Sequence, residues 1–440
     1  MKVIVLGAGV IGTTAAWFLN KSGHEVTVID RQPVAGNETS FANGGQISVS
    51  HAEPWANPSA PLKVLKWLAR EDAPLLFRPR MDPAQWRWCA RFLLECLPSR
   101  TRHNIAQIVR LGLYSRATLQ ALRAETGLEY DHLTRGILHF YTDQKEFDAA
   151  LAPAQVMRDH GCEVDMIDAD ACVRIEPALA SARDRLVGGS FTPSDESGDA
   201  HTFSVELAKR AAARGATFLN ETRILGLDLA GGRIESVRIV DANGTPSTLR
   251  ADAFVMAMGS YSARMLGTVG IDVPIYPAKG YSVTLPVGPQ HVAPNVSLTD
   301  DAYKIVFSRL GDRLRCAGTA ELNGYDTDLN ETRCRAIVER MFALFPEAGD
   351  RSQVRYWTGL RPATPSNVPL IGQSRIPNLY LDTGHGTLGW THACGSGQAI
   401  ADIVSGRAPE VDFAFIGAPK PRTAQVRSLA RARKVPDLGV

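Results

Sequence analysis

The chain has 440 residues, of which 45% are hydrophobic and 21% charged; this composition is typical of a globular protein large enough for two domains. The formal net charge is only +2, so no overall field indicates nucleic acid as a partner. The seven cysteines form no CxxC pair, and we therefore expect a reducing compartment with neither a disulfide framework nor a metal site.

The N-terminal segment predicts a strand, a glycine turn, a helix and a second strand. Residues 3–6 are an apolar, β-branched run, typical of a strand that is buried on both faces. Gly7, Gly9 and Gly12 follow as GxGxxG, and the second strand ends at Asp30, 18 residues after Gly12. In this motif the glycines allow close approach of a pyrophosphate, the helix N-terminus faces the phosphates and the acid accepts the ribose hydroxyls. We predict a dinucleotide site here rather than a plain glycine turn.

The segment 38–55 favours FAD over NAD. It is rich in Ser, Thr, Asn and Gly, where an NAD domain would continue with an apolar βα unit. Its donors can line a pyrophosphate and a flavin edge, although an ordinary surface loop has the same composition. Residues 201–229 predict a helix and a strand, residues 231–254 a hairpin series, and residues 250–262 a buried strand that ends at Gly259. The α/β sheet is thus expected to be assembled from separated segments.

With these residues in view, the chain resembles the FAD-dependent D-amino acid dehydrogenases of the wider amino-acid oxidase family, which includes glycine oxidase and D-amino acid oxidase. The resemblance extends to about residue 408 and includes the stretches GAGVIGTTAAWFLNKSGHEVTVIDRQP, ETSFANGGQIS, FTPSDESGD, VPIYPAKGYSVTL, YWTGLRPATPSNVPLIG and LDTGHGTLGWTHACGSGQ. It implies an α/β fold with a Rossmann-like FAD-binding domain of the glutathione-reductase type, assembled from discontinuous segments, and an α+β substrate domain with a mixed or antiparallel sheet. The expected segments are 1–54, 185–265 and 356–410 for the FAD domain, 55–184 and 266–355 for the substrate domain, and 411–440 for a basic tail.

The motif and the resemblance together imply a set of residues that contact FAD. They are Val3, Gly7, Ala8, Gly9, Val10, Ile11, Gly12, Asp30, Arg31, Thr39, Ser40, Asn43, Gly45, Gln46, Ile224, Gly259, Gly384, His385, Gly386, Thr387, Leu388, Gly389, Trp390 and Thr391.

The C-terminal glycine-rich segment is part of this set. In the family it returns beneath the flavin, which implies that residues 384–391 approach the pyrimidine ring. A helix begins nearby, and its N-terminus would stabilise an anionic reduced flavin. Leu388 and Trp390 would shield the ring from water, while we interpret His385 and His392 as structural residues.

The substrate residues are also implied by the resemblance. Arg361 lies in the Gly-Leu-Arg-Pro context where the oxidase family keeps its carboxylate-binding arginine. An arginine fork suits a carboxylate, and a tyrosine hydroxyl can assist it. Tyr303, just before a predicted strand–turn–strand unit, is the second candidate. Tyr276 and Tyr281 are further candidates, for which a core or rim role fits equally well.

The region 55–110 carries four tryptophans and ten Lys or Arg against four Asp or Glu. Its stretches 61–70 and 84–97 predict amphipathic helices, which either lie on a membrane surface or cap a domain. The tail 418–440 is basic and is predicted to be disordered. We expect a cytoplasmic protein, with peripheral contact with the inner membrane as an open alternative.

The sequence leads to one preferred function and several alternatives. We interpret the chain as an enzyme that oxidatively deaminates D-amino acids such as D-alanine, by hydride transfer from Cα to flavin N5, to 2-oxo acids and ammonia. Its electrons would pass to a quinone-linked acceptor. A cyclic substrate, cis-4-hydroxy-D-proline or D-proline, and an oxidase that uses O₂ stay open. The intact GLRP and TGHGTLGW stretches disfavour a flavin-binding protein without turnover, and the segmented sheet disfavours an NAD-dependent dehydrogenase.

Overall fold

The computed structural model describes residues 1–67 and 73–417. The segment 68–72 and the predicted basic tail at 418–440 lie outside the described residues. Within the described ranges, every helix is too short or too polar to serve as a membrane span.

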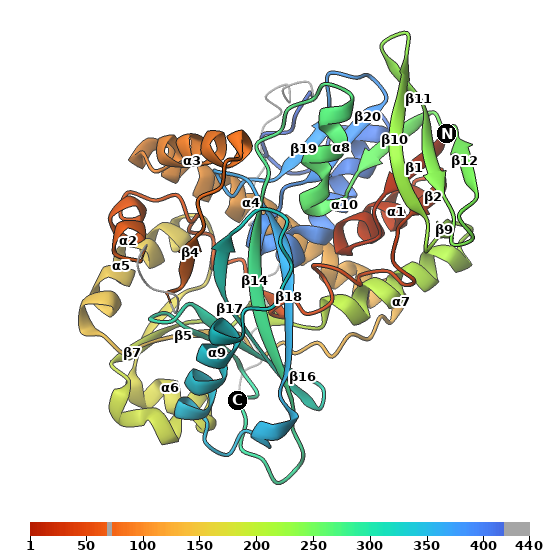
Figure 1. Ribbon diagram of the computed structural model, residues 1–440. Helices are drawn as coiled ribbons and strands as arrows, with labels where there is room; N and C mark the ends of the chain where they lie inside the picture. Colours follow the sequence, from red (N-terminus) through yellow and green to blue (C-terminus); the bar gives the residue numbers. More distant parts are fainter. Residues whose placement is uncertain (68–72, 418–440) are drawn as a thin grey trace, which may run out of the picture.

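A six-stranded sheet lies at the centre of the half that carries the glycine motif (Figure 1). Its spatial order is β19-β20-β13-β1-β2-β9, and only β19 runs antiparallel to its neighbour. Strands from both ends of the chain therefore meet in one sheet. The strand bounds are β1 (Lys2–Leu6), β2 (Glu25–Ile29), β9 (Thr217–Leu219), β13 (Ala253–Met256), β19 (Leu370–Gln373) and β20 (Leu379–Thr383).

Strand β1 is buried on both faces, as its sequence predicts. Alternate side chains of a strand point to opposite faces. Val3 and Val5 accordingly pack in the core of the helical layer, whereas Ile4 and Leu6 pack in the core of a small antiparallel sheet. In Figure 1 the small sheet stands to the right of the first sheet. The helices of the first layer are α1 (Val10–Lys21), α7 (Ala200–Ala213) and α10 (Gly389–Val404), and the small sheet consists of β10 (Arg223–Ala230), β11 (Arg233–Val240) and β12 (Pro246–Leu249).

A nine-stranded mixed sheet forms the second half. The long strand β14 pairs antiparallel with β17 on one side and with β18 on the other, and β18 is the edge. Helix α9 (Glu331–Leu344) covers one face of this sheet through a core that includes Tyr281 and Val283. The strand bounds are β4 (Leu75–Phe77), β5 (Ile137–Tyr141), β6 (Asp165–Asp168), β7 (Gly188–Thr192), β14 (Tyr276–Pro286), β15 (Ser297–Asp300), β16 (Ile305–Leu310), β17 (Arg313–Leu322) and β18 (Arg355–Ala363). A separate two-stranded sheet pairs β3 (Gln46–Ile47) with β8 (Glu196–Ser197).

The remaining helices include those predicted within 55–110. Helix α3 begins after Asp82, whose carboxylate accepts from the Ala84 N–H, and has Pro83 in its first turn. Helix α4 ends at Gly127, which adopts a left-handed conformation with φ 59°. The bounds are α2 (Ala60–Trp67), α3 (Pro83–Glu95), α4 (Pro98–Thr126), α5 (Gln144–Asp159), α6 (Ala169–Ile175) and α8 (Ser262–Thr268).

The fold class is confirmed. A largely parallel sheet with helices carries the glycine motif, and a mixed nine-stranded sheet forms the second half of the molecule. The predicted domain limits differ from the sheets at two strands. The segments 185–265 and 356–410 include β7 and most of β18, but both strands belong to the nine-stranded sheet. Their pairing explains the difference, since β7 pairs with β5 and β6, and β18 pairs along its length with β14.

Candidate active site

The glycine turn between β1 and α1 leaves no room for side chains. Gly7 has φ +103°, and a Cβ there would lie 2.6 Å from the Ala257 carbonyl oxygen. A Cβ on Gly12 would lie 1.9 Å from the Gly7 carbonyl oxygen. Gly9 is the N-cap of α1 and contributes no capping side chain; of the first N–H groups of the helix, that of Val10 donates to Ser40 Oγ at 3.1 Å. This geometry fits a pyrophosphate at the helix N-terminus.

The end of β2 places acidic and hydroxyl-binding groups beside this turn. The Asp30 carboxylate accepts from the Ala8 N–H at 2.6 Å and from the Gln32 N–H at 2.8 Å. Burial raises the pKa of Asp30, so this carboxylate gains from any further donor, such as a ribose diol. The Arg31 guanidinium lies over the Tyr261 ring, 4.2 Å from its centroid. These groups fit the adenosine half of FAD.

The loop at 38–46 connects the two sheets. Ser40 Oγ accepts from the Val10 N–H at 3.1 Å, and the Thr39 hydroxyl donates to the Leu360 carbonyl at 2.9 Å. The Gln46 amide donates to the Ser297 hydroxyl at 3.1 Å. The loop therefore runs from the N-terminus of α1 to β18 and β15, where a flavin attached to the pyrophosphate would have to pass.

Other predicted cofactor residues occupy the rim of the same region. Val3 lies within β1, and Ile11 lies in the first turn of α1. Asn43 Oδ1 accepts from the Gly45 N–H at 2.8 Å. Ile224 begins the small sheet just after Thr222, whose N–H donates to the Asp30 carbonyl at 2.8 Å. Gly259 has φ +53° and accepts from the Thr383 hydroxyl at 3.3 Å.

The segment 384–391 connects β20 to α10. Gly384 and Gly386 have φ +80° and +55°, which glycine adopts without strain. Gly389 is the first residue of α10, and Thr391 Oγ1 accepts from the Ser48 N–H at 3.1 Å. The segment thus lies against the residues that follow the 38–46 loop.

Trp390 packs in the hydrophobic core of the helical layer. Its indole N–H donates to the Gly198 carbonyl at 3.0 Å, and its ring packs against Phe203 at a centroid distance of 4.6 Å. Leu388 packs with Val49 and Ile108. Trp390 therefore contributes to the core beside α7. The direction of its side chain depends on where α10 begins, which the sequence alone does not reveal.

A buried polar cluster follows β20 directly. The Ser396 hydroxyl donates to Asp382 Oδ1, and it lies 2.9 Å from His385 Nε2. When the Asp382 carboxyl is ionised, the single hydroxyl hydrogen of Ser396 points to it, and His385 then donates through Nε2. Burial raises the pKa of Asp382 to about 7 and lowers that of His385 well below its usual value. At neutral pH the imidazole is therefore neutral and the carboxyl is about half protonated, which fits a structural role for His385.

A small cavity lies where the 38–46 loop, the 384–391 segment and the second sheet meet. It is lined by Thr39, Ala42, Asn43, Gly44, Gly280, Tyr281, Ala317, Trp357, Gly359, Arg361, Gly386 and Thr387. The structure thus brings four predicted cofactor residues to the same cavity as Arg361. Among the side chains that the structure describes, no group of three His, Cys, Asp or Glu is placed to hold a metal ion.

The guanidinium of Arg361 lies in the wall of the cavity, partly buried and without a counter-charge among the described residues. Its Nη1 donates to the Thr319 carbonyl at 3.2 Å, and in the described part of the chain no carboxylate forms an ion pair with it. Burial lowers its pKa to about 10, so the group still carries its charge at neutral pH. A buried cation is costly unless an anion pairs with it. Arg361 can therefore bind the carboxylate of a ligand.

The backbone next to the Arg361 guanidinium has an unusual conformation at Thr319 and an irregular strand pairing at Gly280. Thr319 has φ +56°, a conformation that is strained for a β-branched residue, and this turns its carbonyl toward the guanidinium. The strain accompanies a bulge between β14 and β17 next to Gly280. A Cβ on Gly280 would lie 2.0 Å from Arg361 Nη1. Gly280 thus provides the space in which the guanidinium lies.

The three predicted tyrosines have different positions. Tyr281 contributes to the cavity wall, but its hydroxyl donates to Glu321, whose carboxylate lies 3.6 Å from Lys279 Nζ. The Tyr276 hydroxyl donates to Asp82 at 3.2 Å, outside the cavity lining. Tyr303 is 50% exposed, and the Arg340 guanidinium covers its ring at 4.1 Å. Tyr303 is thus not brought to the cavity, because the β15–β16 turn that carries it faces solvent.

Seven residues of this site were not predicted: Ala42, Gly44, Gly280, Ala317, Thr319, Trp357 and Gly359. A signal for two of them exists in the sequence. Trp357, Gly359 and Arg361 alternate along the sequence, so on the strand β18 they share a face. The pairing of β18 with β14, which brings Gly280 beside them, has no local signal.

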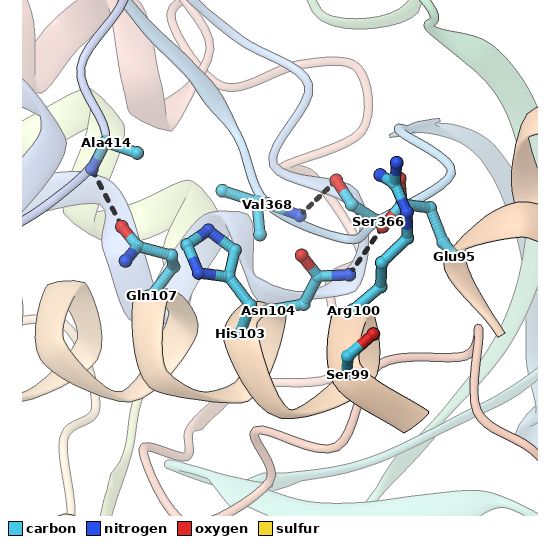
Figure 2. A pocket seen from close by; sticks show the side chains of 9 residues that line it. All are labelled: Glu95, Ser99, Arg100, His103, Asn104, Gln107, Ser366, Val368 and Ala414. Carbon is cyan, nitrogen blue, oxygen red and sulfur yellow. Dashed lines mark hydrogen bonds and ion pairs between the residues drawn. The ribbon is translucent and has the colours of Figure 1, made fainter. Parts of the chain in front are cut away.

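A larger hollow of about 470 Å³ lies behind this site, between α4 and the segment 366–368 (Figure 2). Its polar side chains are mostly bonded to each other or to backbone, as in the contacts of Asn104 with Glu95 at 2.9 Å and of Gln107 with the Ala414 N–H at 2.7 Å. Val368 and Leu388 pack in one apolar cluster. The hollow contains none of the predicted site residues.

Comparisons with known proteins agree with the FAD site that the geometry indicates. Residues 2–403 match the family model described as FAD dependent oxidoreductase. A D-amino acid dehydrogenase of Dechloromonas aromatica is 59% identical over 416 residues, covering 94% of this chain and 100% of the relative. The enzyme of the same name from Paramagnetospirillum magneticum is 53% identical, over 95% of this chain and 98% of the relative.

Solved structures share the fold. An L-proline dehydrogenase from P. horikoshii superimposes with a TM-score of 0.72 at 18% identity, covering 92% of this chain and 94% of the other. A glycine oxidase from Geobacillus kaustophilus gives a TM-score of 0.71 at 21% identity, with 93% and 96% covered.

Proposed function

Because this chain belongs to the FAD-dependent oxidoreductase family, and within it to the D-amino acid dehydrogenases, we propose that it oxidises acyclic D-amino acids of the D-alanine type to 2-oxo acids and ammonia. The observation that supports this most is the charged, partly buried guanidinium of Arg361 at a cavity bounded by the loops that would hold the flavin. An amino acid brings the carboxylate that this cation lacks.

The cofactor is FAD. The glycine turn and the N-terminus of α1 would hold its pyrophosphate, and Asp30 its ribose hydroxyls. The 38–46 loop and the 384–391 segment would hold the flavin. Bound FAD would supply the acceptor for a hydride; loss of that hydride from Cα of the neutral amine leaves an iminium ion, which water hydrolyses to the 2-oxo acid and ammonium.

The residues of this chain bind and orient the substrate. Arg361 binds the carboxylate, and the Thr319 carbonyl fixes the guanidinium. Of the described residues that line the cavity, none is His, Lys, Asp or Glu. This supports direct hydride transfer from a neutral amine, since the lining offers no side chain of the usual kind to act as a base.

The test is anaerobic reduction of the purified flavoprotein. We would mix it with D-alanine, D-proline, cis-4-hydroxy-D-proline, glycine and the L-forms, and follow the loss of flavin absorbance. Fast reduction by D-alanine and other acyclic D-forms supports the proposal. Reduction confined to the cyclic imino acids would move the function to those substrates, and no reduction by any of them would exclude amino acids as the substrate class.

We propose a quinone-linked acceptor in place of O₂. A quinone analogue should reoxidise the reduced flavin much faster than air-saturated buffer does. Stoichiometric hydrogen peroxide from D-alanine in air would instead indicate an oxidase.

We further propose that α3 contacts a membrane. Its outer face exposes Trp86 and Leu93 by 51% and 57%, with Leu97 just beyond the helix, and the exposed Arg87 follows Trp86 directly. In Figure 1 the helix lies at the edge of the molecule. An apolar stripe flanked by arginine is typical of an interfacial helix.

Flotation with anionic vesicles tests this contact. Leu93→Ser combined with Leu97→Ser should abolish binding, whereas Leu151→Ser, an exposed leucine on α5, should retain it. Unchanged flotation of the double variant would contradict the proposal.

A further inference from the structure

We propose that Trp357 limits the size of the substrate side chain, and that the paired glycines Gly280 and Gly359 hold Trp357 and Arg361 against the same cavity. The inference rests on the proposed function, since it concerns the substrate that Arg361 would bind.

The strand register places these residues on one face. In the β14–β18 pair, Gly280 lies opposite Gly359, Ala278 opposite Arg361, and Ser282 opposite Trp357. Residues two apart along a strand share a face. Trp357 and Arg361 therefore stand on either side of the glycine pair.

The space above the two glycines is filled by those two side chains. A Cβ on Gly359 would lie 2.1 Å from Trp357 Cη2, and a Cβ on Gly280 would lie 2.0 Å from Arg361 Nη1. Real Cβ atoms essentially never show such short distances, so an alanine at either position would displace one large side chain from its place. The indole and the guanidinium both lean over the glycine pair, from opposite directions along β18.

This arrangement determines where a substrate side chain must go. A carboxylate on Arg361 fixes Cα near the glycine pair, and the substrate side chain then meets the indole. The neighbouring wall residues Ala42, Gly44 and Ala317 are small. Tyr281 does not compete for this role, because its hydroxyl is held by Glu321.

The indole is also packed in a way that allows its removal. Trp357 is only partly buried, and its aromatic neighbour Phe41, at a centroid distance of 6.4 Å, is itself 40% exposed. Truncating Trp357 should enlarge the cavity toward solvent without opening a void in a closed core.

The experiment compares kcat/KM for D-alanine, D-leucine and D-phenylalanine in the holoenzyme. We expect Trp357→Ala to raise the ratio of D-phenylalanine to D-alanine about tenfold or more, since a pocket that gains several methylene volumes changes its discrimination by that amount. Tyr356→Ala is the matched control, because Tyr356 is the neighbouring aromatic on the opposite face of β18 and is 38% exposed. Its ratio should stay at the wild-type value.

A ratio unchanged in Trp357→Ala, with flavin content and melting temperature near wild type, would overturn the inference. Gly359→Ala gives a second test, because the new methyl group must push the indole into the cavity. We expect it to reduce kcat/KM for D-phenylalanine more than for D-alanine; equal losses for both would contradict the proposal.

Failure of the proposed function can be separated from failure of this inference. If no D-amino acid reduces the wild-type flavin, binding of propionate and of phenylacetate is measured from the change that each causes in the flavin spectrum. Trp357→Ala should then favour phenylacetate over propionate about tenfold relative to wild type. Equal effects on both acids would refute the size limit itself.

Discussion

Arg361, which is partly buried, and Asp382, which is fully buried, are both ionisable groups at the proposed site, but they respond to burial in different ways. Burial lowers the pKa of Arg361 to about 10, so this guanidinium remains charged at neutral pH. Burial raises the pKa of Asp382 to about 7, so this carboxyl can take up a proton. The acid can give up its charge, and one of its oxygens is bonded to Ser396 within its own cluster while the other is unpaired among the described residues, whereas the arginine requires an anion from outside. A buried group that cannot lose its charge indicates a ligand site, and one that can lose it indicates internal structure.

The strongest test of this contrast is Arg361→Ala. Loss of the cation should raise KM for D-alanine about 10²–10³-fold, since breaking a buried charge pair costs several kcal/mol. The flavin content should remain at the wild-type level. Arg309→Ala is the control, because Arg309 donates to the Gly311 carbonyl on the adjacent hairpin. Near-normal kinetics of Arg361→Ala would remove this residue from the site.

Gly280→Ala should have the next largest effect. Its methyl group would displace the guanidinium from its place and raise KM about 10²-fold, the order expected for a misplacement of about 1 Å. The matched control is Gly226→Ala on β10. A Cβ there would also crowd an arginine, at 2.4 Å from Arg238 Nη2, but neither residue lines the cavity. If both variants reduced kcat/KM equally, the specific role of Gly280 would be disproved.

Asp382→Asn should change how stability depends on pH. The folded-state pKa of about 7 lies above the usual 3.8, so between these values the folded chain holds a proton that the unfolded chain has released. This carboxyl therefore contributes stability that is lost as the pH rises through the window and is absent above it. Between about pH 5 and about pH 8 the free energy of unfolding of the wild type should fall with rising pH. We expect this fall to be about 2–3 kcal/mol larger than the fall in Asp382→Asn.

Denaturant titrations across that pH range measure this difference. Asp228→Asn is the control, because the Asp228 carboxylate is partly exposed and accepts from the Ser236 hydroxyl. Its pH dependence should follow the wild type. Identical curves for Asp382→Asn and the wild type would show that the Asp382 carboxyl titrates normally in the folded state.

Tyr303→Phe should have the smallest effect. The exposed ring lies under Arg340, outside the residues that line the cavity, and surface changes of this kind rarely exceed about 0.5 kcal/mol. We expect kcat/KM for D-alanine within about twofold of wild type. A loss of an order of magnitude would return Tyr303 to the site, as the sequence suggested.

The sequence predicts those parts of the fold and the site that are determined by residues close together in the chain. The turn at Gly7 and Gly12, the helix after it and Asp30 at the end of β2 lie within one short stretch, and each has a local signal. The features that the sequence does not predict depend on long-range pairing. Gly280 meets Gly359 only because β14 and β18 pair, 79 residues apart. The burial of Trp390 against Phe203 depends likewise on the packing of α10 beside α7.

The six-stranded sheet has a consequence for how the protein is made. Val3 pairs with Ala253, 250 residues later, and Phe254 pairs with Leu379 beyond it. During synthesis the apolar first strand thus emerges from the ribosome long before its partner, and such distant pairings form slowly. The cofactor site is completed only when α10 has been translated. A chain that stops before Gly389 would therefore contain every strand of the sheet but lack the helix that closes the site, however intact its N-terminal motif.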